Sequence, residues 1–315
     1  MVLPGIRFNE LSVSTAMTDT IEYGLRAGGF GILIMELSML MHTGKRLVCY
    51  VPTLDHPLYS LKKIYKISDD RLTIVYQAEA TRHPVSNDMI KAFSPYIMPP
   101  TVNLFGEDYP TGRRGKTCIG LAMHAYGLGE DKKIQHSPYH KFASREIYNQ
   151  IIKLADLAGY DVLTVNQPKM SVEHKAFLLN EYCDCLISYE GGVAHLAHTL
   201  NVPTIILPWK YHGDGTAIDT VEDEINWVSH SYHMDKKTYF LNSQDEMNEW
   251  SVDKLKSTID SLYAEQGNNR YYLPGLEIDT ENLEFNGTII NAPFSTVDTK
   301  IKDFIKEHIK DIRVH

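Results

Sequence analysis

Between residues 117 and 207, short apolar segments alternate with longer amphipathic segments, and this alternation constrains the fold more than any other feature of the chain. The apolar segments are short enough to be strands, and they lie at residues 117–123, 160–165, 185–188 and 203–207. Between them, apolar residues recur at helical spacing, which predicts helices within residues 144–158, 172–182 and 193–200. Strands that alternate with helices are typical of a parallel sheet with helices on its faces. The sequence therefore predicts an α/β fold, with a Rossmann-like domain in this half.

The first half of the chain has a shorter version of the same pattern. The predicted elements are, in order, strand 20–27, helix 32–41, strand 45–51, helix 58–67 and strand 71–76. Prolines and glycines then gather in residues 94–116, which we interpret as a linker between two domains. Beyond the second α/β unit, apolar stripes predict helices at residues 252–263 and 298–312.

Charge and cysteine content narrow the functional classes. With 31 Lys and Arg against 40 Asp and Glu, the chain has a net charge of −9, which disfavours nucleic acid or an anionic membrane as a partner of the whole surface. A local basic site is still compatible with this charge, but the compact basic cluster at residues 113–116 is better interpreted as a solvated linker. The four cysteines have no metal-site spacing, so we expect reduced core thiols and no bound metal.

The start of the chain lacks the pattern of a secretory signal. Its most apolar run, residues 30–41, contains Glu36 and is too short to span a bilayer, so a buried helix is expected there. We therefore expect a cytoplasmic protein without a transmembrane segment.

The segment from Ser188 to Ala197 is the strongest candidate for a binding site. A predicted strand leads into Gly191 and Gly192, which open a predicted helix. Glycines let backbone N–H groups approach a ligand closely, and a helix N-terminus favours an anion, so a diphosphate fits this turn. Glu190 could accept hydrogen bonds from sugar or ribose hydroxyls, and His195 could reach phosphate or sugar. The alternative is a tight turn without a ligand, with His195 as a packed histidine.

This segment resembles the C-terminal signature of the ADP-heptose-type heptosyltransferases. The matching residues are Gly192, His195, Leu196, Ala197, Pro203 and Thr204. Glu190 stands where that family has Asp, and Gly191 stands where it has Ser or Thr. The resemblance is close over residues 184–208 and loose from residue 117 onward.

The resemblance implies a GT-B fold, in which two Rossmann-like domains face a cleft. We accordingly expect an N-terminal acceptor domain at residues 1–112 and a nucleotide-sugar domain at 113–295. Residues 296–315 would form a C-terminal helix that returns to the first domain. The implied activity is transfer of a hexosyl or heptosyl group from a nucleotide-diphosphate donor to a hydroxyl acceptor, such as a glycan or a lipid-linked glycan.

Further candidate residues lie in loops that follow predicted strands, where α/β sheets bind ligands. In the first domain, the glycine turn could contact the donor or the acceptor through Gly28, Gly29 and Gly31. The heptosyltransferases carry a catalytic Asp in this loop, and none is present here. Asp55, His56 and Glu79 are candidates for the base, and we prefer Asp55 for this role, together with His195 as a catalytic residue. In the second domain, the candidates for donor binding are His124, Lys210, Tyr211 and Asp214. Each of these could also be an ordinary solvated loop residue.

The sequence therefore predicts a glycosyltransferase that inverts configuration and needs neither a cofactor nor a metal, since no apolar-flanked Asp-x-Asp is present. Two alternatives remain open. UDP-N-acetylglucosamine 2-epimerases share the GT-B fold and a similar Gly-Gly helix start. A non-catalytic protein that binds a sugar nucleotide or a glycan is compatible with the missing Asp.

Overall fold

The computed structural model divides the chain into two compact units, residues 1–97 and 98–315. It describes residues 19–24, 30–78, 116–123, 145–165, 170–189, 191–207, 238–243, 245–266, 282–285 and 288–291. The predicted boundary between residues 112 and 113 lies outside the described residues, and so does the predicted helix at 298–312. Both stay predictions.

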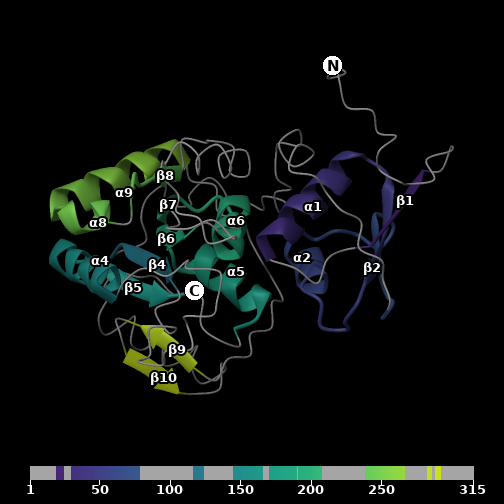
Figure 1. Cartoon of the computed structure of the whole chain (residues 1–315), viewed down its shortest axis with the longest axis horizontal. Coiled ribbons are helices and arrows are strands. Elements are labelled where there is room, and N and C mark those ends of the chain that lie inside the picture. The colour runs from purple at the N-terminus through teal and green to yellow at the C-terminus, as the bar shows by residue number, and fades with distance from the viewer. Residues whose placement is uncertain are drawn as a thin grey trace, which may run out of the picture. The chain divides into compact units, whose positions relative to one another are not determined.

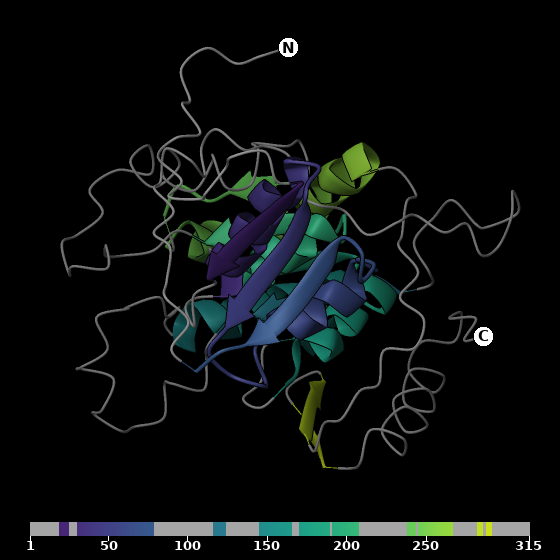
Figure 2. The same ribbon diagram turned by 90° about the vertical axis from the view of Figure 1, so that its right-hand side faces the viewer.

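Unit 1 contains a three-stranded parallel sheet in the order β1-β2-β3, whose strands Figure 2 shows side by side. Its elements are β1 (Thr20–Gly24), α1 (Phe30–His42), β2 (Arg46–Val51), α2 (Leu58–Ile64) and β3 (Leu72–Tyr76). Along β2, Leu47, Cys49 and Val51 are buried while the residues between them are more exposed. Helix α1 buries Leu33 and Leu37 at helical spacing, and its Glu36 is also fully buried. The predicted strand–helix–strand order of this half is confirmed.

Unit 2 contains a seven-stranded sheet in the order β10-β9-β5-β4-β6-β7-β8 (Figure 1). Its strands are β4 (Cys118–Ala122), β5 (Asp161–Thr164), β6 (Cys185–Tyr189), β7 (Thr204–Leu207), β8 (Thr238–Phe240), β9 (Asn282–Phe285) and β10 (Thr288–Asn291). Its helices are α4 (Arg145–Ala158), α5 (Val172–Glu181), α6 (Gly192–Thr199), α8 (Glu246–Glu249) and α9 (Val252–Gln266). The strands β4 to β8 pair in parallel, whereas β9 runs antiparallel to β5 and β10. The predicted α/β class is therefore confirmed, with an antiparallel addition that was not predicted.

Helices cover both faces of the sheet of unit 2. On one face, alternate residues of the central strands pack against α4, α8 and α9 in a single apolar core. That core includes Ile119 and Leu121 of β4 and Ile187 of β6. Helices α5 and α6 contact each other on the opposite face (Figure 1). This is the layered arrangement that buries the apolar faces of a parallel sheet.

The ends of several helices follow from single residues. Gly44, two residues after α1, and Gly159, directly after α4, have φ values of +72° and +76°, and this left-handed conformation ends a helix. Ser171 accepts a hydrogen bond from the N–H of His174 at 3.1 Å and so caps α5.

Within the described residues, no helix is long and apolar enough to cross a membrane.

Candidate functional site

The order of strands in unit 2 creates one switch point in the sheet. From β4 the chain passes through α4 to β5 on one side, and then through α5 to β6 on the other side of β4. The helices that follow β4 and β6 consequently lie on opposite faces of the sheet. Open parallel sheets bind ligands outside the carboxyl ends of the two strands at such a point. The carboxyl ends of β4 and β6, at Ala122 and Tyr189, are therefore the place where this fold favours a ligand.

The turn between β6 and α6 needs glycine for its backbone. Gly191 has φ +155° and ψ −173°, a combination that residues with a side chain rarely adopt. No heavy atom of the described residues lies within 4 Å of a Cβ placed on Gly191, whereas its backbone conformation does favour glycine. Glu190, which precedes it, lies outside the described residues. The predicted glycine turn is thus present, and it is half-buried rather than covered.

The first turn of α6 receives no hydrogen bond from a capping side chain, because its cap residue is Gly191. Other helices do have a side-chain acceptor at their start. Ser171 serves α5, Ser251 accepts from the Lys254 N–H at 3.1 Å in α9, and His56 Nδ1 accepts from the Leu58 N–H at 3.2 Å in α2. The first N–H groups of a helix have no partner within the helix. At α6 no side chain of the described residues caps these groups, so the turn is suited to an acceptor from a ligand, and the helix dipole favours an anion there.

His195 lies in the first turns of α6, and its side chain is fully buried. Its backbone N–H donates to Gly191 O at 3.0 Å, as expected in a regular helix. The neighbouring strand is tied in place by Ser188, whose Oγ lies 3.3 Å from Ala122 O and 2.8 Å from Tyr189 O. The contact of His195 with a ligand stays a prediction, since a ligand would have to reach a covered side chain.

Tyr189 lies within the predicted segment Ser188–Ala197, but no role was predicted for it. It is the last residue of β6 and is only 3% exposed. Within the described residues its hydroxyl has no hydrogen-bond partner, and burial raises the pKa of this phenol far above its usual value. The signal in the sequence was a polar atom at a core-facing position of a strand that leads into the glycine turn.

The two base candidates in unit 1 differ in exposure. Asp55 is exposed after β2, whereas His56 is 3% exposed and holds the start of α2 through Nδ1. Gly31 lies buried in the first turn of α1. The remaining candidates lie outside the described residues: Gly28, Gly29, Glu79, His124, Glu190, Lys210, Tyr211 and Asp214. The structure therefore brings together Gly191, Gly192 and His195 of the predicted donor site, and the roles of all these residues stay predictions.

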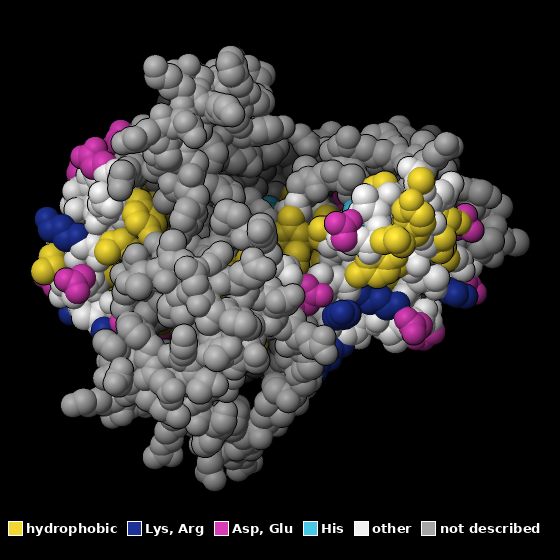
Figure 3. Space-filling model, turned by 90° about the horizontal axis from the view of Figure 1, so that it is seen from below, with side chains coloured by type: hydrophobic (Ala, Val, Ile, Leu, Met, Phe, Trp, Pro, Cys, Tyr) yellow, Lys and Arg dark blue, Asp and Glu magenta, His cyan; other side chains and the backbone are white. Residues whose placement is uncertain are grey.

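The basic cluster at residues 113–116 is represented in the described chain by Lys116. Its Nζ lies 2.7 Å from Oδ1 of Asp161, whose side chain is 1% exposed. The ammonium group of Lys116 therefore forms an ion pair with a buried carboxylate of unit 2. On the face shown in Figure 3, the described Lys and Arg side chains lie among Asp and Glu rather than in one basic field. Among the described residues, no group of three or more His, Cys, Asp or Glu side chains is placed to hold a metal ion.

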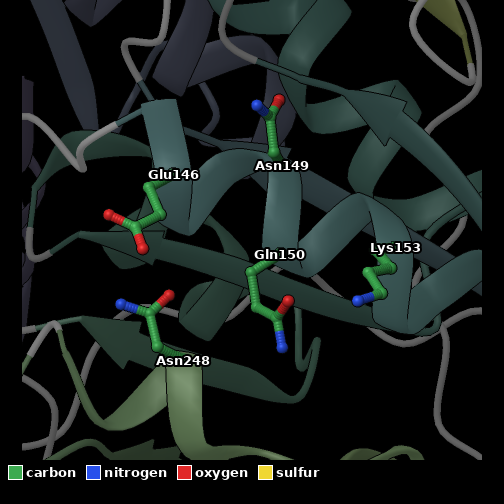
Figure 4. A pocket seen from close by; sticks show the side chains of 5 residues that line it. All are labelled: Glu146, Asn149, Gln150, Lys153 and Asn248. Carbon is green, nitrogen blue, oxygen red and sulfur yellow. The ribbon is translucent and has the colours of Figure 1, made fainter.

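A shallow pocket of about 530 Å³ lies on the outer side of α4 and α8. The residues that line it all have polar or charged side chains: Glu146, Asn149, Gln150, Lys153 and Asn248 (Figure 4). None of the predicted site residues contributes to it. It is also open to solvent, so we do not assign the predicted ligand to it.

No protein-family model matches the chain, and no curated protein sequence matches it. Among solved structures, the iron-containing heptosyltransferase TibC in complex with ADP-D-β-D-heptose aligns at 9% identity, over 78% of this chain and 76% of TibC, with a TM-score of 0.43. The E. coli heptosyltransferase WaaC with ADP aligns at 12% identity, over 76% of this chain and 98% of WaaC, with a TM-score of 0.36. The glycosyltransferase SnogD from Streptomyces nogalater aligns at 10% identity, over 79% of this chain and 67% of SnogD, with a TM-score of 0.33.

TibC and WaaC are heptosyltransferases, the family that residues 184–208 resemble, whereas SnogD is described as a glycosyltransferase. Their TM-scores lie below 0.5, so the function of this chain has to be argued from its own geometry. That geometry defines a class of protein with two α/β units, each containing parallel strands, the second of which has a switch point in its sheet.

Proposed function

We propose that this protein is a glycosyltransferase that moves a sugar from a nucleotide-diphosphate donor to a hydroxyl acceptor. The observation that carries the proposal is the Gly191–Gly192 turn that starts α6 at the switch point of unit 2, where Gly191 has a φ value of +155°. A diphosphate suits this place, because several N–H donors and the positive end of a helix dipole can meet its charge without a metal. The resemblance of residues 184–208 to heptosyltransferases supports a sugar nucleotide as the source of that diphosphate.

The proposed reaction is metal-independent and inverts configuration. The N–H groups of the first turn of α6 would stabilise the negative charge that develops on the departing nucleoside diphosphate. A base must take the proton of the acceptor hydroxyl, and unit 1 offers Asp55 and His56 for this. Lys210, Tyr211 and Asp214 would complete the donor site. Departure of the diphosphate without a metal is the step that most depends on the α6 turn.

The first test is binding of nucleotides to the wild-type protein. UDP, ADP, GDP and CMP, with their sugar conjugates, are compared by the increase in Tm that each produces. Saturation at about 100 times the Kd stabilises a protein by roughly 2.7 kcal/mol, so a real donor gives a clear shift. If no compound of the panel raises the Tm, the proposal is wrong.

A pair of glycine variants locates the site. Gly191→Ala forces a side chain into a conformation that costs roughly 1–3 kcal/mol, and we expect it to abolish most of the Tm increase by nucleotide. Gly159→Ala is the matched control, because φ there is +76° and a Cβ also meets no atom within 4 Å, but the residue follows α4 at the other end of the sheet. Gly159→Ala should lower the Tm of the free protein and leave the nucleotide effect intact. An equal loss of binding in both variants would reject the α6 turn as the site.

Product analysis separates the transferase from the epimerase. A transferase releases free nucleoside diphosphate only when an acceptor is present, whereas an epimerase interconverts sugar nucleotides without one. Tight nucleotide binding with neither reaction would favour a non-catalytic binding protein.

A further inference from the structure

The hydroxyl of Tyr189 is a buried polar group for which the described residues provide no hydrogen-bond partner. Buried polar side-chain atoms in native proteins almost always have a hydrogen-bond partner, so each exception requires an explanation. Other tyrosine hydroxyls of this chain are engaged. Tyr239 Oη lies 3.3 Å from Oε1 of Glu246, and Tyr50 Oη lies 3.2 Å from Oε2 of Glu22. Tyr189 Oη has no such partner within the described residues.

Packing alone does not explain why this position carries a hydroxyl. The ring of Tyr189 belongs to the apolar core beneath α4 and α9, together with Ile187 and Leu207. A phenylalanine would fill the same space without burying an unsatisfied oxygen. Burial raises the pKa of the phenol, so the group keeps its proton and can donate a hydrogen bond.

The position of Tyr189 fits a ligand at the switch point. It ends β6 at the carboxyl edge, two residues before Gly191. Strand alternation and core contacts place its ring on the face covered by α4, while α6 starts on the opposite face. A ligand whose diphosphate lies at the start of α6 and which extends across the end of β6 would therefore reach the α4 side with another part of the molecule.

We propose that Tyr189 is a donor-binding residue whose hydroxyl donates a hydrogen bond to an oxygen of the nucleoside or of the sugar, rather than to the diphosphate. This inference rests on the proposed function, since it assigns a second contact to the same ligand. It divides recognition between two faces of the sheet. The backbone at Gly191 and Gly192 holds the phosphates, and Tyr189 selects the group attached to them.

The test uses Tyr189→Phe in the full-length protein, with Tyr239→Phe as the matched control. The Kd values of inorganic pyrophosphate, of UDP, ADP and GDP, and of their glucose conjugates are measured by calorimetry, and the Tm of each free protein is recorded. We expect Tyr189→Phe to weaken at least one nucleotide or nucleotide sugar by roughly three- to tenfold, the usual loss for one neutral hydrogen bond, without changing the Kd of pyrophosphate. The Tm of the free Tyr189→Phe protein should equal or exceed that of the wild type, because no internal bond is lost. Tyr239→Phe should instead lower the Tm and leave every Kd unchanged.

The outcomes separate this inference from the proposed function. Weaker binding of nucleoside diphosphates places the hydroxyl at the nucleoside, and weaker binding of the glucose conjugates alone places it at the sugar. Unchanged Kd values for every ligand that the wild type binds would overturn the inference and leave the proposed function standing. An equal loss for pyrophosphate, or a fall in the Tm of free Tyr189→Phe, would also overturn it. If the wild type binds none of the nucleotides, both the function and the inference fail.

Discussion

A methyl group added at Gly120 should destabilise unit 2 by a clash that the structure defines. A Cβ built on Gly120 lies 2.8 Å from Sγ of Cys183 and 3.4 Å from Cδ1 of Leu186. Favourable contacts between such atoms lie near 3.5–4.0 Å, so the first distance is too short by roughly 0.7 Å or more. Cys183 is fully buried, and its Sγ cannot move out toward solvent. Strand β4 is held on both sides, by β5 and β6, and cannot shift without loss of ladder hydrogen bonds.

Overpacking of this kind costs about 1–3 kcal/mol in a well-packed core. Replacing glycine by alanine also reduces the entropy of the unfolded chain, which returns about 0.4–1 kcal/mol. We therefore expect Gly120→Ala to reduce the free energy of unfolding by a net of about 1–2 kcal/mol. For a unit of this size that corresponds to a fall in Tm of roughly 2–8 °C.

The three tryptophans of the chain, Trp209, Trp227 and Trp250, all lie in unit 2, so tryptophan fluorescence in urea follows this unit selectively. The control is Cys183→Ala, which removes the sulfur that the new methyl group meets. In the double variant the methyl group occupies the vacated space, and we expect a favourable coupling of about 1–2 kcal/mol between the two changes. A Gly120→Ala protein as stable as the wild type, or strictly additive effects in the double variant, would refute the reasoning.

Three further predictions follow from buried groups. Burial lowers the pKa of His174 from 6.5 to about 3, so the unfolded chain takes up a proton at this residue at a higher pH than the folded chain does. The free energy of unfolding therefore falls as the pH drops below about 6.5, by roughly 2 kcal/mol between pH 7 and pH 5. Urea titrations of His174→Gln should lack this component of the pH dependence. Equal pH dependence in both proteins would contradict it. Lys116→Met removes the cation that lies beside the buried Asp161, so we expect the free energy of unfolding to fall by roughly 1–3 kcal/mol and the urea midpoint to fall with it. Lys116→Met combined with Asp161→Asn should recover part of this loss. An unchanged midpoint in the single variant would show that the pair is not stabilising. Burial raises the pKa of Cys49 to about 12, and all four cysteines are buried. A thiol reagent should therefore label the native protein only as fast as local or global unfolding exposes the thiols. Immediate labelling of any thiol would contradict the structure.

The elements of both α/β units could be predicted because their signals are local. Glycine just after an apolar helical stripe is a local signal for the end of a helix, and Gly44 and Gly159 have positive φ values. The expectation of reduced core cysteines is confirmed by four buried free thiols. The strands β9 and β10 were missed, although a local signal was present. Thr288 pairs with Phe285, and the two residues between these strands are Asn286 and Gly287, a pair typical of a two-residue hairpin. This hairpin is formed by two strands of four residues each, and its signal is weaker than that of the repeated strand–helix pattern.

The chemistry of the site is harder to predict, and two adjacent residues of β6 show why. Alternation along a strand predicts that Ser188 and Tyr189 point to opposite faces of the sheet, but it does not predict which hydroxyl has a hydrogen-bond partner in the folded chain. In the folded chain, Ser188 Oγ lies 3.3 Å from Ala122 O, 66 positions earlier in the sequence, while Tyr189 Oη has no hydrogen-bond partner within the described residues. The partner of each hydroxyl is therefore set by distances across the sheet that no local pattern contains. A hydroxyl that holds the fold together and a hydroxyl that is kept for a ligand look the same in the sequence, and only the folded structure separates them.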